Sequence, residues 1–482
     1  MGRRIKPFNI ELDIIDAATD GRSVARHGEQ VVFVEGGVPG DRADVRVFTR
    51  KKNMLIGKVE QIISPSPHRK EPVCQHFEFC GGCKWQHMSY EGQLKAKENQ
   101  VYEVIRRISK IPCGELLPIL GSDSDYFYRN KLEFTFSSKA WWPKEVLDHG
   151  EELDSRVLGF HVPRIFDKIL DIDTCLLQVP IVNDIRNETQ DFCRNQNIDF
   201  YDIRENKGFL RNLVFRTSVA TGELMIILIV AQNEPEIIDT IFNHLAEKFP
   251  QITQFVWIHN PKLNSSYGDF DYQVWRGEPY IIEKLGDYRF KIRPTSFFQT
   301  NPLQAEKLYG VVKAFLKETL VADQSSHDII YDLYSGTGSI GIFVSKLAEK
   351  IVGIEYVQAA VDDARENVQL NQLDDKFSFY AGDMKDLLND ELIAKEGRPN
   401  VVIADPPRQG MVPKVVDKII EMSPEYVIYV SCNPSTQARD IAQMAPHYDL
   451  LKIQPVDMFP QTAHVENIAL LRRKSIARQA SV

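Results

Sequence analysis

The sequence lacks any run of the ~18 uninterrupted apolar residues that a membrane-spanning helix requires. Basic residues stand near its start, but acidic residues follow before any continuous apolar segment, so we expect no secretory signal. Cysteine is scarce as well, with 7 among 482 residues, which argues against a small disulfide-stabilised secreted protein. We therefore expect a cytoplasmic protein that makes no contact with a membrane.

An excess of positive charge is also missing, since the formal net charge is -9. A nucleic acid would have to be bound by local patches of Lys and Arg rather than by the chain as a whole. Residues 1–70 supply one such patch, with 13 basic against 9 acidic residues. The apolar content of 43% and the length of 482 residues predict a globular protein of two to three domains.

Three regions of the chain differ in hydrophobic pattern. Short β-rich runs separated by turn clusters predict a small OB-like β-barrel over residues 1–64. This region resembles a TRAM domain, and that resemblance implies RNA binding. Residues 65–286 alternate helical and strand-like stretches, which predicts a central α+β domain. Residues 287–482 consist of β-then-helix units and predict an α/β domain with a doubly wound, Rossmann-like sheet.

A cofactor pocket is predicted near the start of the C-terminal domain. The segment DIIYDLYSGTGSIG places a buried strand before a glycine turn and a helix, so backbone can approach a ligand closely at the carboxyl end of the strand. Glu355 ends the next strand, where an acid binds ribose hydroxyls in dinucleotide folds. The glycine turn alone is weak evidence, because tight turns need Gly for steric reasons.

Two further acids strengthen this prediction. Asp383 follows a third strand and Asp405 ends a fourth, while no Lys follows the glycines to bind a triphosphate. Taken singly, Glu355 fits a solvated strand-end acid and Asp383 fits a helix N-cap. Successive acids at the carboxyl ends of one sheet favour a ligand crevice. The series resembles a class I S-adenosylmethionine methyltransferase.

A candidate nucleophile follows the predicted strand at residues 426–430. Cys432 comes two residues after this strand and so lies at the same sheet edge as Asp405. A lone Cys is most often a small buried hydrophobe, but one facing a predicted cofactor pocket is a candidate nucleophile. A thiolate suits uracil, because C5 attacks a methylsulfonium only after sulfur adds at C6 and creates an enolate. A base must then remove the C5 proton before the sulfur is eliminated.

The segment QTAHVENIALLRR contains two candidates for that base. Glu466 stands where a late strand begins, just after Phe459 and Pro460. His464 is a rival on chemical grounds, and Glu466 also fits a strand-edge carboxylate in a surface salt bridge. These residues alone leave the choice open.

Four motifs occur in order with the glycine turn and extend the evidence over nearly the whole chain. Together they resemble the RNA uracil-C5 methyltransferase family. This resemblance implies S-adenosyl-L-methionine as cofactor, Cys432 as the nucleophile on C6, and Glu466 as the base that removes the C5 proton. The motifs are SFFQTN (296–301), DPPRQG (405–410), SCNP (431–434) and HVENIALL (464–471).

The resemblance also implies which residues hold the cofactor or the edge of the target base. The glycine turn SGTGSIG departs from the CGMGNF form of some members, so we expect no direct cofactor contact by Ser339. The implied positions are Gln299, Tyr334, Gly336, Gly338, Glu355, Asp383 and Asp405.

Cys74, Cys80 and Cys83 are clustered with C-x5-C-x2-C spacing, which can surround one metal centre in a reducing compartment. Cys175 is the best fourth ligand, since it follows a strand-like run. Four thiolates suit zinc, but zinc ligands usually come as two close pairs. Three clustered thiols and a remote one are closer to a [4Fe-4S] pattern, and the ribosomal branch of the resembled family carries this pattern as a [4Fe-4S] site. A disulfide is the weakest alternative in the cytosol.

The methyl-transfer chemistry does not require this cluster, so we expect it to have a structural or RNA-contacting role. Aromatic residues nearby could stack on RNA bases or shield the cluster from water. These residues are Phe77, Phe79, Trp85 and His87.

Three alternative functions stay open from the residues. Methylation of an adenine or guanine amino group is one, although an aromatic residue usually follows D-P-P in such enzymes and Arg408 stands here. A non-catalytic iron-sulfur protein that binds RNA or senses redox state is another, but it leaves Cys432 and Glu466 unexplained. The third is 5-methyluridine formation in the T-loop of tRNA. By analogy, the barrel and the cluster favour 23S rRNA, with a monomer acting on a uridine flipped from a single-stranded or loop region.

Overall fold

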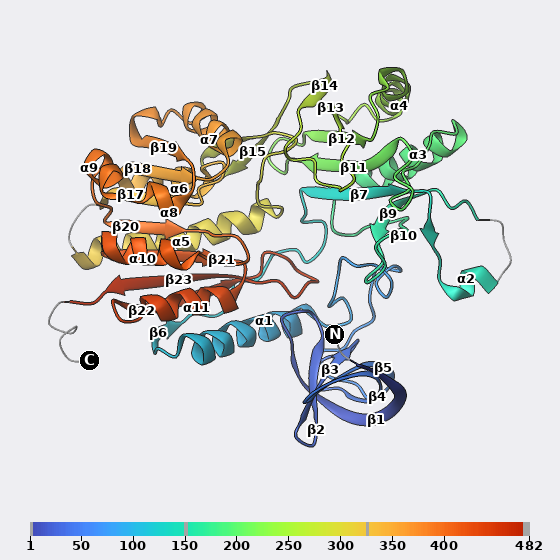
Figure 1. The fold of residues 1–482 in the computed structure, drawn as a ribbon, viewed down its shortest axis with the longest axis horizontal. Helices are drawn as coiled ribbons and strands as arrows, with labels where there is room; N and C mark the ends of the chain where they lie inside the picture. The colour runs from blue at the N-terminus through green and yellow to red at the C-terminus, as the bar shows by residue number, and fades with distance from the viewer. Residues whose placement is uncertain (1–2, 149–152, 324–326, 476–482) are drawn as a thin grey trace.

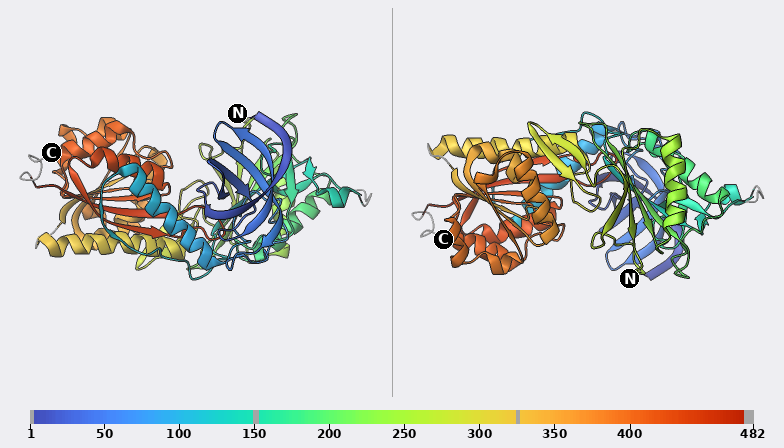
Figure 2. Two further views of the ribbon diagram at one scale, coloured as in Figure 1. Left: turned by 90° about the horizontal axis from the view of Figure 1, so that it is seen from below. Right: turned by 90° about the horizontal axis from the view of Figure 1, so that it is seen from above.

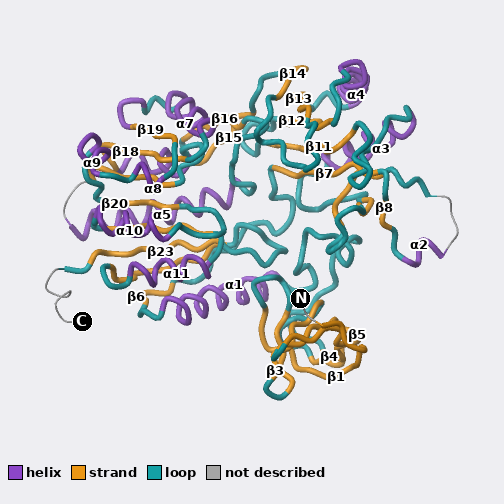
Figure 3. The backbone as a smooth tube through the Cα atoms, in the orientation of Figure 1, coloured by secondary structure: helices purple, strands orange, loops and turns teal. Residues whose placement is uncertain are grey.

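The computed structural model describes residues 3–148, 153–323 and 327–475. These residues form an N-terminal barrel, a central sheet and a larger sheet covered by helices (Figure 1). From below and from above, the larger sheet makes one lobe, and the barrel and central sheet lie together at the other end (Figure 2). Loops fill the region between these three bodies (Figure 3). All three can therefore contribute side chains to one junction.

The N-terminal barrel arises from strands whose buried and exposed side chains alternate. Its strands are β1 (Arg3–Ala17), β2 (Ser23–His27), β3 (Gln30–Glu35), β4 (Arg42–Lys51) and β5 (Met54–Ser64). They close in the order β1-β2-β3-β5-β4, which confirms the expected barrel. Val32, Val34, Val45 and Val47 are fully buried inside it. The sequence SVARH carries only a weak strand signal, yet it forms β2 because it pairs with both β1 and β3.

The central sheet carries buried apolar side chains on both of its faces. Its elements are β7 (Lys131–Ser137), β8 (Ala140–Trp141), α2 (Lys144–Asp148), β9 (Val157–His161), β10 (Ile169–Asp171), α3 (Ile181–Asn195), β11 (Leu210–Thr217), β12 (Leu224–Val230), α4 (Pro235–Lys248), β13 (Gln254–His259) and β14 (Tyr272–Arg276). The strand order is β14-β13-β12-β11-β7-β9-β10-β8. Phe134 and Phe215 pack with Ile185 of α3 and Phe242 of α4, so these helices cover one face.

The larger sheet has the strand order β19-β18-β17-β20-β21-β23-β22-β6. The bounds are β6 (Cys113–Leu116), α5 (Pro302–Asp323), β17 (His327–Leu333), α6 (Ser339–Val344), β18 (Ala348–Glu355), α7 (Gln358–Leu370), β19 (Phe377–Ala381), α8 (Met384–Leu387), α9 (Asp390–Glu396), β20 (Val401–Ala404), α10 (Pro413–Met422), β21 (Tyr426–Ser431), α11 (Pro434–Met444), β22 (Tyr448–Val456) and β23 (Glu466–Arg473). Strands β17 to β21 are parallel, as expected for a doubly wound fold, and β23 is antiparallel to β21. Two short 3₁₀ turns lie at Ser345–Leu347 and Asp374–Lys376.

The segment from α1 (Tyr90–Val104) to β6 joins the larger sheet rather than the central domain expected over residues 65–286. A π-helical turn, Ile105–Ser109, continues α1. Strand β6 then pairs in parallel with β22 and covers the edge of the sheet. The turn of the separate hairpin formed by β15 (Ile281–Leu285) and β16 (Tyr288–Ile292) spans the other expected boundary. The first difference depends on pairing between distant segments, which local hydrophobic pattern does not encode, and the second arises because a local hairpin spans the expected boundary.

Helices bury both faces of the larger sheet. Leu308 and Phe315 of α5 pack on the face that carries Ile330. On the opposite face, Val101 of α1 and Ile441 of α11 belong to the same apolar cluster. None of the helices in the described part of the chain combines the length and hydropathy that a bilayer crossing requires.

Candidate active site

Cys432 and Glu466 come together at the carboxyl edge of the larger sheet. Strand β21 runs parallel to β20 and ends at Ser431, so Cys432 lies just beyond this edge. Strand β23 runs the other way with Asn467 opposite Ser431, and its first residue, Glu466, therefore lies at the same edge. Asp405 follows β20 there as well. The antiparallel β23 thus brings together groups that are far apart in the sequence.

Burial sets the protonation of these three groups. It raises the pKa of the Asp405 carboxyl, and burial together with the charge of Asp405 raises the pKa of Glu466, which is only 4% exposed. Burial, with repulsion from Glu466 and Asp405, raises the pKa of the Cys432 thiol to about 12, while Arg408 acts in the opposite direction. The thiol is therefore neutral at rest, and the carboxyls of Glu466 and Asp405, whose charges act on it, are candidates to take its proton.

Arg408 places a positive charge beside Cys432 and His464. Its Nη2 lies 3.3 Å from His464 Nδ1, and its carbonyl accepts bonds from Asn433 Nδ2 at 2.9 Å and Thr436 Oγ1 at 3.3 Å. A guanidinium can only donate, so Nδ1 of His464 accepts and its ring proton is on Nε2. Burial and the charge of Arg408 lower the pKa of His464 to about 4. Such a ring is less suited to remove a proton than a carboxyl with a raised pKa.

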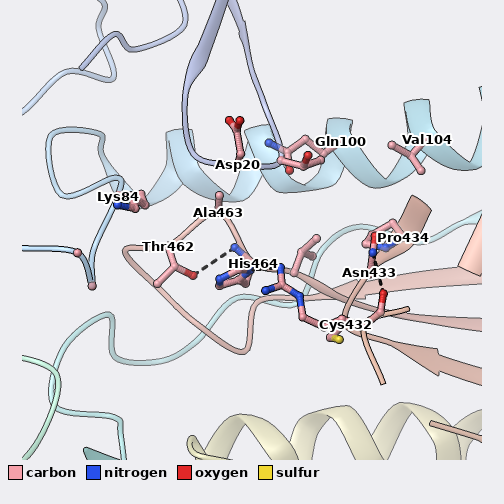
Figure 4. Close-up of a pocket in the computed structure, with 15 residues that line it drawn as sticks. Asp20, Lys84, Gln100, Val104, Cys432, Asn433, Pro434, Thr462, Ala463 and His464 are labelled. Carbon is pink, nitrogen blue, oxygen red and sulfur yellow. Dashed lines mark hydrogen bonds between the residues drawn. The ribbon is translucent and has the colours of Figure 1, made fainter. Parts of the chain in front are cut away.

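A cavity of about 440 Å³ opens beside Cys432. Figure 4 shows Cys432, Asn433 and Pro434 at one side, with Gln100 and Val104 of α1 across from them. The barrel contributes the β1–β2 loop, and the cysteine segment contributes its glycines and a lysine. Its remaining lining residues are Thr19, Asp20, Gly81, Gly82, Lys84, Arg408, Thr462, Ala463, His464 and Val465. No pattern in the sequence predicts that the β1–β2 loop of the barrel forms part of this wall.

The glycine turn and Glu355 form one hydrogen-bonded unit. The Glu355 carboxylate accepts bonds from the backbone N–H of Gly336 at 3.1 Å and of Val357 at 3.0 Å, so it is not merely solvated. Tyr334 has a φ of 62°, which costs energy for a residue with a Cβ and often marks functional sites. Gly336 and Gly338 have φ values of 53° and 77°, and a Cβ at Gly336 would meet no atom within 4 Å. The backbone at Gly336 therefore faces open space.

Asp332 is a buried acid that the sequence reasoning missed. It is 2% exposed, and its Oδ2 accepts a bond from Gly341 N at 3.0 Å. Within the described part of the chain, its Oδ1 and the Ser335 hydroxyl have no partner. Burial, with the charges of Asp405 and Glu355, raises its pKa to about 7. The signal available in the sequence is a lone acid inside the apolar strand IIYDL.

Gln299 and Asp383 occupy different kinds of position. Gln299 is buried before α5, where its carbonyl accepts a bond from Asn130 Nδ2 at 3.2 Å. Asp383 is the N-cap of α8, accepting from Lys385 N at 3.1 Å and pairing with Lys385 Nζ at 2.7 Å. The N-cap alternative therefore describes Asp383 in this structure, and its contact with a cofactor stays a prediction.

The four cysteines named as ligands line a second cavity, of about 330 Å³. They are Cys74, Cys80, Cys83 and Cys175. The N–H of Gly82 donates to Cys80 Sγ at 3.4 Å, and burial raises the pKa of Cys83 to about 11 and of Cys175 to about 12. Among the described residues, no three His, Cys, Asp or Glu converge closely enough to hold a single metal ion. The thiols thus surround a space instead of meeting at a point.

The aromatic residues near this cavity pack within the protein. Trp85 is fully buried and donates to a carbonyl of the β1–β2 loop at 3.0 Å. His87 is buried against Phe77, with ring centroids 5.3 Å apart, and Phe79 lies 5.1 Å from Trp141. Because Trp85 and His87 are buried, their rings cannot stack on RNA bases.

The catalytic and cysteine cavities share a wall. Gly81 and Gly82, between two of the clustered cysteines, line both cavities, as does Thr462 in the loop that leads into β23. The cysteine segment therefore borders the space beside Cys432.

Comparison with known proteins places the chain in a family. Residues 280–474 match a model described as tRNA (uracil-5-)-methyltransferase, and residues 10–59 match the TRAM domain. A relative from Porphyromonas gingivalis, described as an uncharacterised RNA methyltransferase, is 43% identical over 96% of this chain and 100% of its own length. One from Chlorobaculum tepidum with the same description is 34% identical over 96% of both chains.

A solved structure agrees over the same extent. The tRNA (uracil-54, C5)-methyltransferase of Pyrococcus abyssi, in complex with S-adenosyl-L-homocysteine, aligns with a TM-score of 0.73 and 26% identity, covering 96% of this chain and 100% of that one. These matches argue against a non-catalytic RNA-binding protein and against methylation of an adenine or guanine amino group. The chain belongs to the RNA uracil-C5 methyltransferase family.

Proposed function

We propose that the enzyme methylates C5 of a uridine in 23S rRNA to give 5-methyluridine, with S-adenosyl-L-methionine as the methyl donor. Cys432 adds to C6 as the nucleophile, and Glu466 removes the C5 proton. The observation that carries this proposal is the meeting of a thiol with two buried carboxyls at one sheet edge, beside a cavity of about 440 Å³.

The electrostatics suggest the order of proton transfers. The Cys432 proton passes to the ionised carboxylate of Asp405 as the S–C6 bond forms, which leaves the Glu466 carboxylate free for the later C5 proton, and Arg408 stabilises the developing thiolate. Electron density moves to C5, which takes the methyl group. Glu466 then accepts the C5 proton, the electron pair re-forms the C5–C6 double bond, and sulfur leaves as a thiolate. Because Asp405 and burial raise the pKa of Glu466, it is basic enough for this step.

The glycine turn fits S-adenosyl-L-methionine. When bound, this cofactor supplies an electrophilic methyl group on a sulfonium. Gly336 faces open space, the carboxylate of Glu355 stands beside it, and Asp332 has an oxygen that finds no partner among the described residues. The Pyrococcus abyssi relative was solved with S-adenosyl-L-homocysteine. The proposed contacts also include Gln299, Tyr334, Gly338, Asp383 and Asp405.

The four cysteines fit a [4Fe-4S] cluster better than a single ion. Zinc would draw four sulfurs to within about 2.3 Å of one point, whereas these thiols line a cavity of about 330 Å³. The N–H of Gly82 directed at Cys80 Sγ is the kind of hydrogen bond that tunes cluster sulfurs. Anaerobic addition of iron and sulfide should produce visible charge-transfer absorbance, and Cys175→Ala should reduce the iron content. Equal iron in both proteins would contradict this assignment.

The choice of 23S rRNA rests on the TRAM barrel together with the cysteine set. The barrel reaches the catalytic cavity through Asp20, so one RNA can contact both. The target uridine would leave its stack to reach Cys432, and we propose that the enzyme acts as a monomer. We propose that the chain consists of three domains, residues 1–64, 65–286 and 287–482. In this division α1 and β6 belong to the second segment but pack with the sheet of the third, and the β15–β16 hairpin spans the boundary between them.

A covalent trap tests the reaction, and two RNAs test the substrate. With cofactor present, 5-fluorouridine-containing 23S rRNA should form a denaturation-resistant adduct with the enzyme, because fluorine blocks the loss of the C5 substituent. Cys432→Ala should form none. Adduct with T-loop RNA alone would assign the enzyme to tRNA, and no adduct with either RNA would overturn the mechanism.

A further inference from the structure

A further cavity, of about 250 Å³, lies on the central sheet. Strands β7, β9 and β11, which are neighbours in that sheet (Figure 1), supply most of its lining. Its volume is below the about 300–1,000 Å³ of pockets for drug-sized ligands, so it suits one nucleoside. It belongs neither to the methyl-transfer site nor to the cysteine cavity.

Polar groups of this cavity come from adjacent strands. Asn212 of β11 is 3% exposed, and its amide nitrogen lies 3.4 Å from Glu133 Oε1 and 3.3 Å from Thr135 Oγ1. Both bonds are longer than the usual 2.7–3.2 Å, so a ligand could replace them. The other oxygen of the half-buried Glu133 accepts the Tyr267 hydroxyl at 3.1 Å. A carboxylate that accepts hydrogen bonds from the neutral groups of Asn212 and Tyr267 and a buried amide thus face the same space.

Aromatic rings provide the rest of the wall. Phe160 and Tyr201 line the cavity, and Phe166 stands at its rim with 64% exposure. The Arg211 guanidinium lies 4.4 Å over the Tyr201 ring and donates to carbonyls of the loop that follows β13, which fixes this loop beside the cavity. An exposed Phe beside fixed polar groups is typical of a surface that stacks on a base.

The position of the cavity connects it with the catalytic centre. Phe160 and His161 line both this cavity and the cysteine cavity. The cysteine cavity in turn shares Gly81 and Thr462 with the space beside Cys432. The cavity on the central sheet therefore adjoins the cysteine cavity, which in turn adjoins the space beside Cys432, so this cavity lies on the same side of the protein as residues that border the methyl-transfer site.

We propose that the cavity between β7, β9 and β11 binds the base of a guanosine in the RNA substrate, a nucleotide other than the methylated uridine. This inference rests on the proposed function, because it assumes an RNA substrate.

The arrangement of donors and acceptors selects guanine. A carboxylate can accept two parallel hydrogen bonds, and only guanine offers two adjacent donors, N1–H and the N2 amino group, on its Watson–Crick edge. The Asn212 amide can donate to O6 next to them. Adenine, cytosine and uracil each present donors at only one position of that edge.

Kinetics with paired variants test the proposal. Glu133→Gln keeps the shape of the side chain and replaces one acceptor with a donor, so KM for RNA should rise about tenfold or more. The kcat should stay within about twofold, since the cavity is away from the reacting atoms. Glu236→Gln on α4, exposed on the other side of the sheet, is the matched control and should change neither constant.

Modified RNA identifies the base. Inosine lacks the N2 amino group, so its substitution for one guanosine should weaken the wild-type enzyme and leave Glu133→Gln unaffected. In RNA carrying 6-thioguanosine at that position, ultraviolet crosslinks should map to residues 131–137 or 201–212. Normal KM for both Glu133→Gln and Asn212→Ala, or crosslinks only from another base, would overturn the proposal. Failure of the proposed function is distinct, because the wild-type enzyme would then methylate no uridine.

Discussion

The buried ion pair between Lys97 of α1 and Asp457, just after β22, should stabilise the catalytic lobe strongly. Their side chains have no exposure and lie 2.6 Å apart. Lys97 Nζ also donates to the Phe459 carbonyl, and Asp457 accepts from Tyr90 OH and Phe459 N. Lys97→Met retains most of the volume but leaves a buried carboxylate without its cation. We expect a loss of about 3–5 kcal/mol in unfolding free energy.

This loss can be measured as a shift in melting temperature. For a cooperative unit of about 150–250 residues, 1 kcal/mol lowers Tm by about 2–4 °C, so Lys97→Met should lower it by about 6–20 °C. Differential scanning calorimetry of the full chain measures this shift. Lys346→Met removes the solvent-exposed pair with Asp287 and serves as the control, with Tm unchanged.

The double variant Lys97→Met/Asp457→Asn separates charge from packing. It removes both charges and should regain part of the lost stability, because no unpaired carboxylate remains buried. The reasoning would be refuted if Lys97→Met melted with the control, or if the double variant were no more stable than the single one.

Three further predictions concern the site. Glu466→Gln should accumulate a denaturation-resistant adduct with unmodified RNA, because the Cys432 sulfur adds to C6 but the C5 proton is not removed. Denaturing gel electrophoresis would detect this adduct. Normal turnover by the variant would contradict the role of Glu466 as the base. His464→Gln should leave the dependence of kcat/KM on pH unchanged between about pH 5.5 and 8, because the lowered pKa of His464, about 4, keeps its ring neutral over that range. If the variant lost an inflection that the wild-type profile shows in this range, the prediction would be wrong. Gly336→Ala should lower stability by about 1–2 kcal/mol through its left-handed backbone and weaken S-adenosylmethionine binding in calorimetry, and unchanged binding would remove Gly336 from the cofactor site.

Features encoded by local pattern could be predicted from the sequence. The acids and Cys432 at strand ends follow from alternation of strands and helices, and the TRAM barrel follows from its β-rich runs. The joining of α1 and β6 to the larger sheet could not be predicted, because it depends on pairing between Cys113 and Leu450. The packing of Asp20 beside the catalytic cavity and the orientation of Arg408 toward His464 likewise depend on contacts between remote segments.

The pairing of β6 with β22 also affects how the protein is synthesised. A ribosome adds about 5–20 residues per second, so β6 leaves the exit tunnel roughly 20–70 s before its partner strand exists. During that interval Val101 of α1 and Ile105 of the π-helical turn have no sheet to cover. The nascent N-terminal third must therefore keep this helix from aggregating, by contact with the barrel or with a chaperone, until nearly the whole chain has been made.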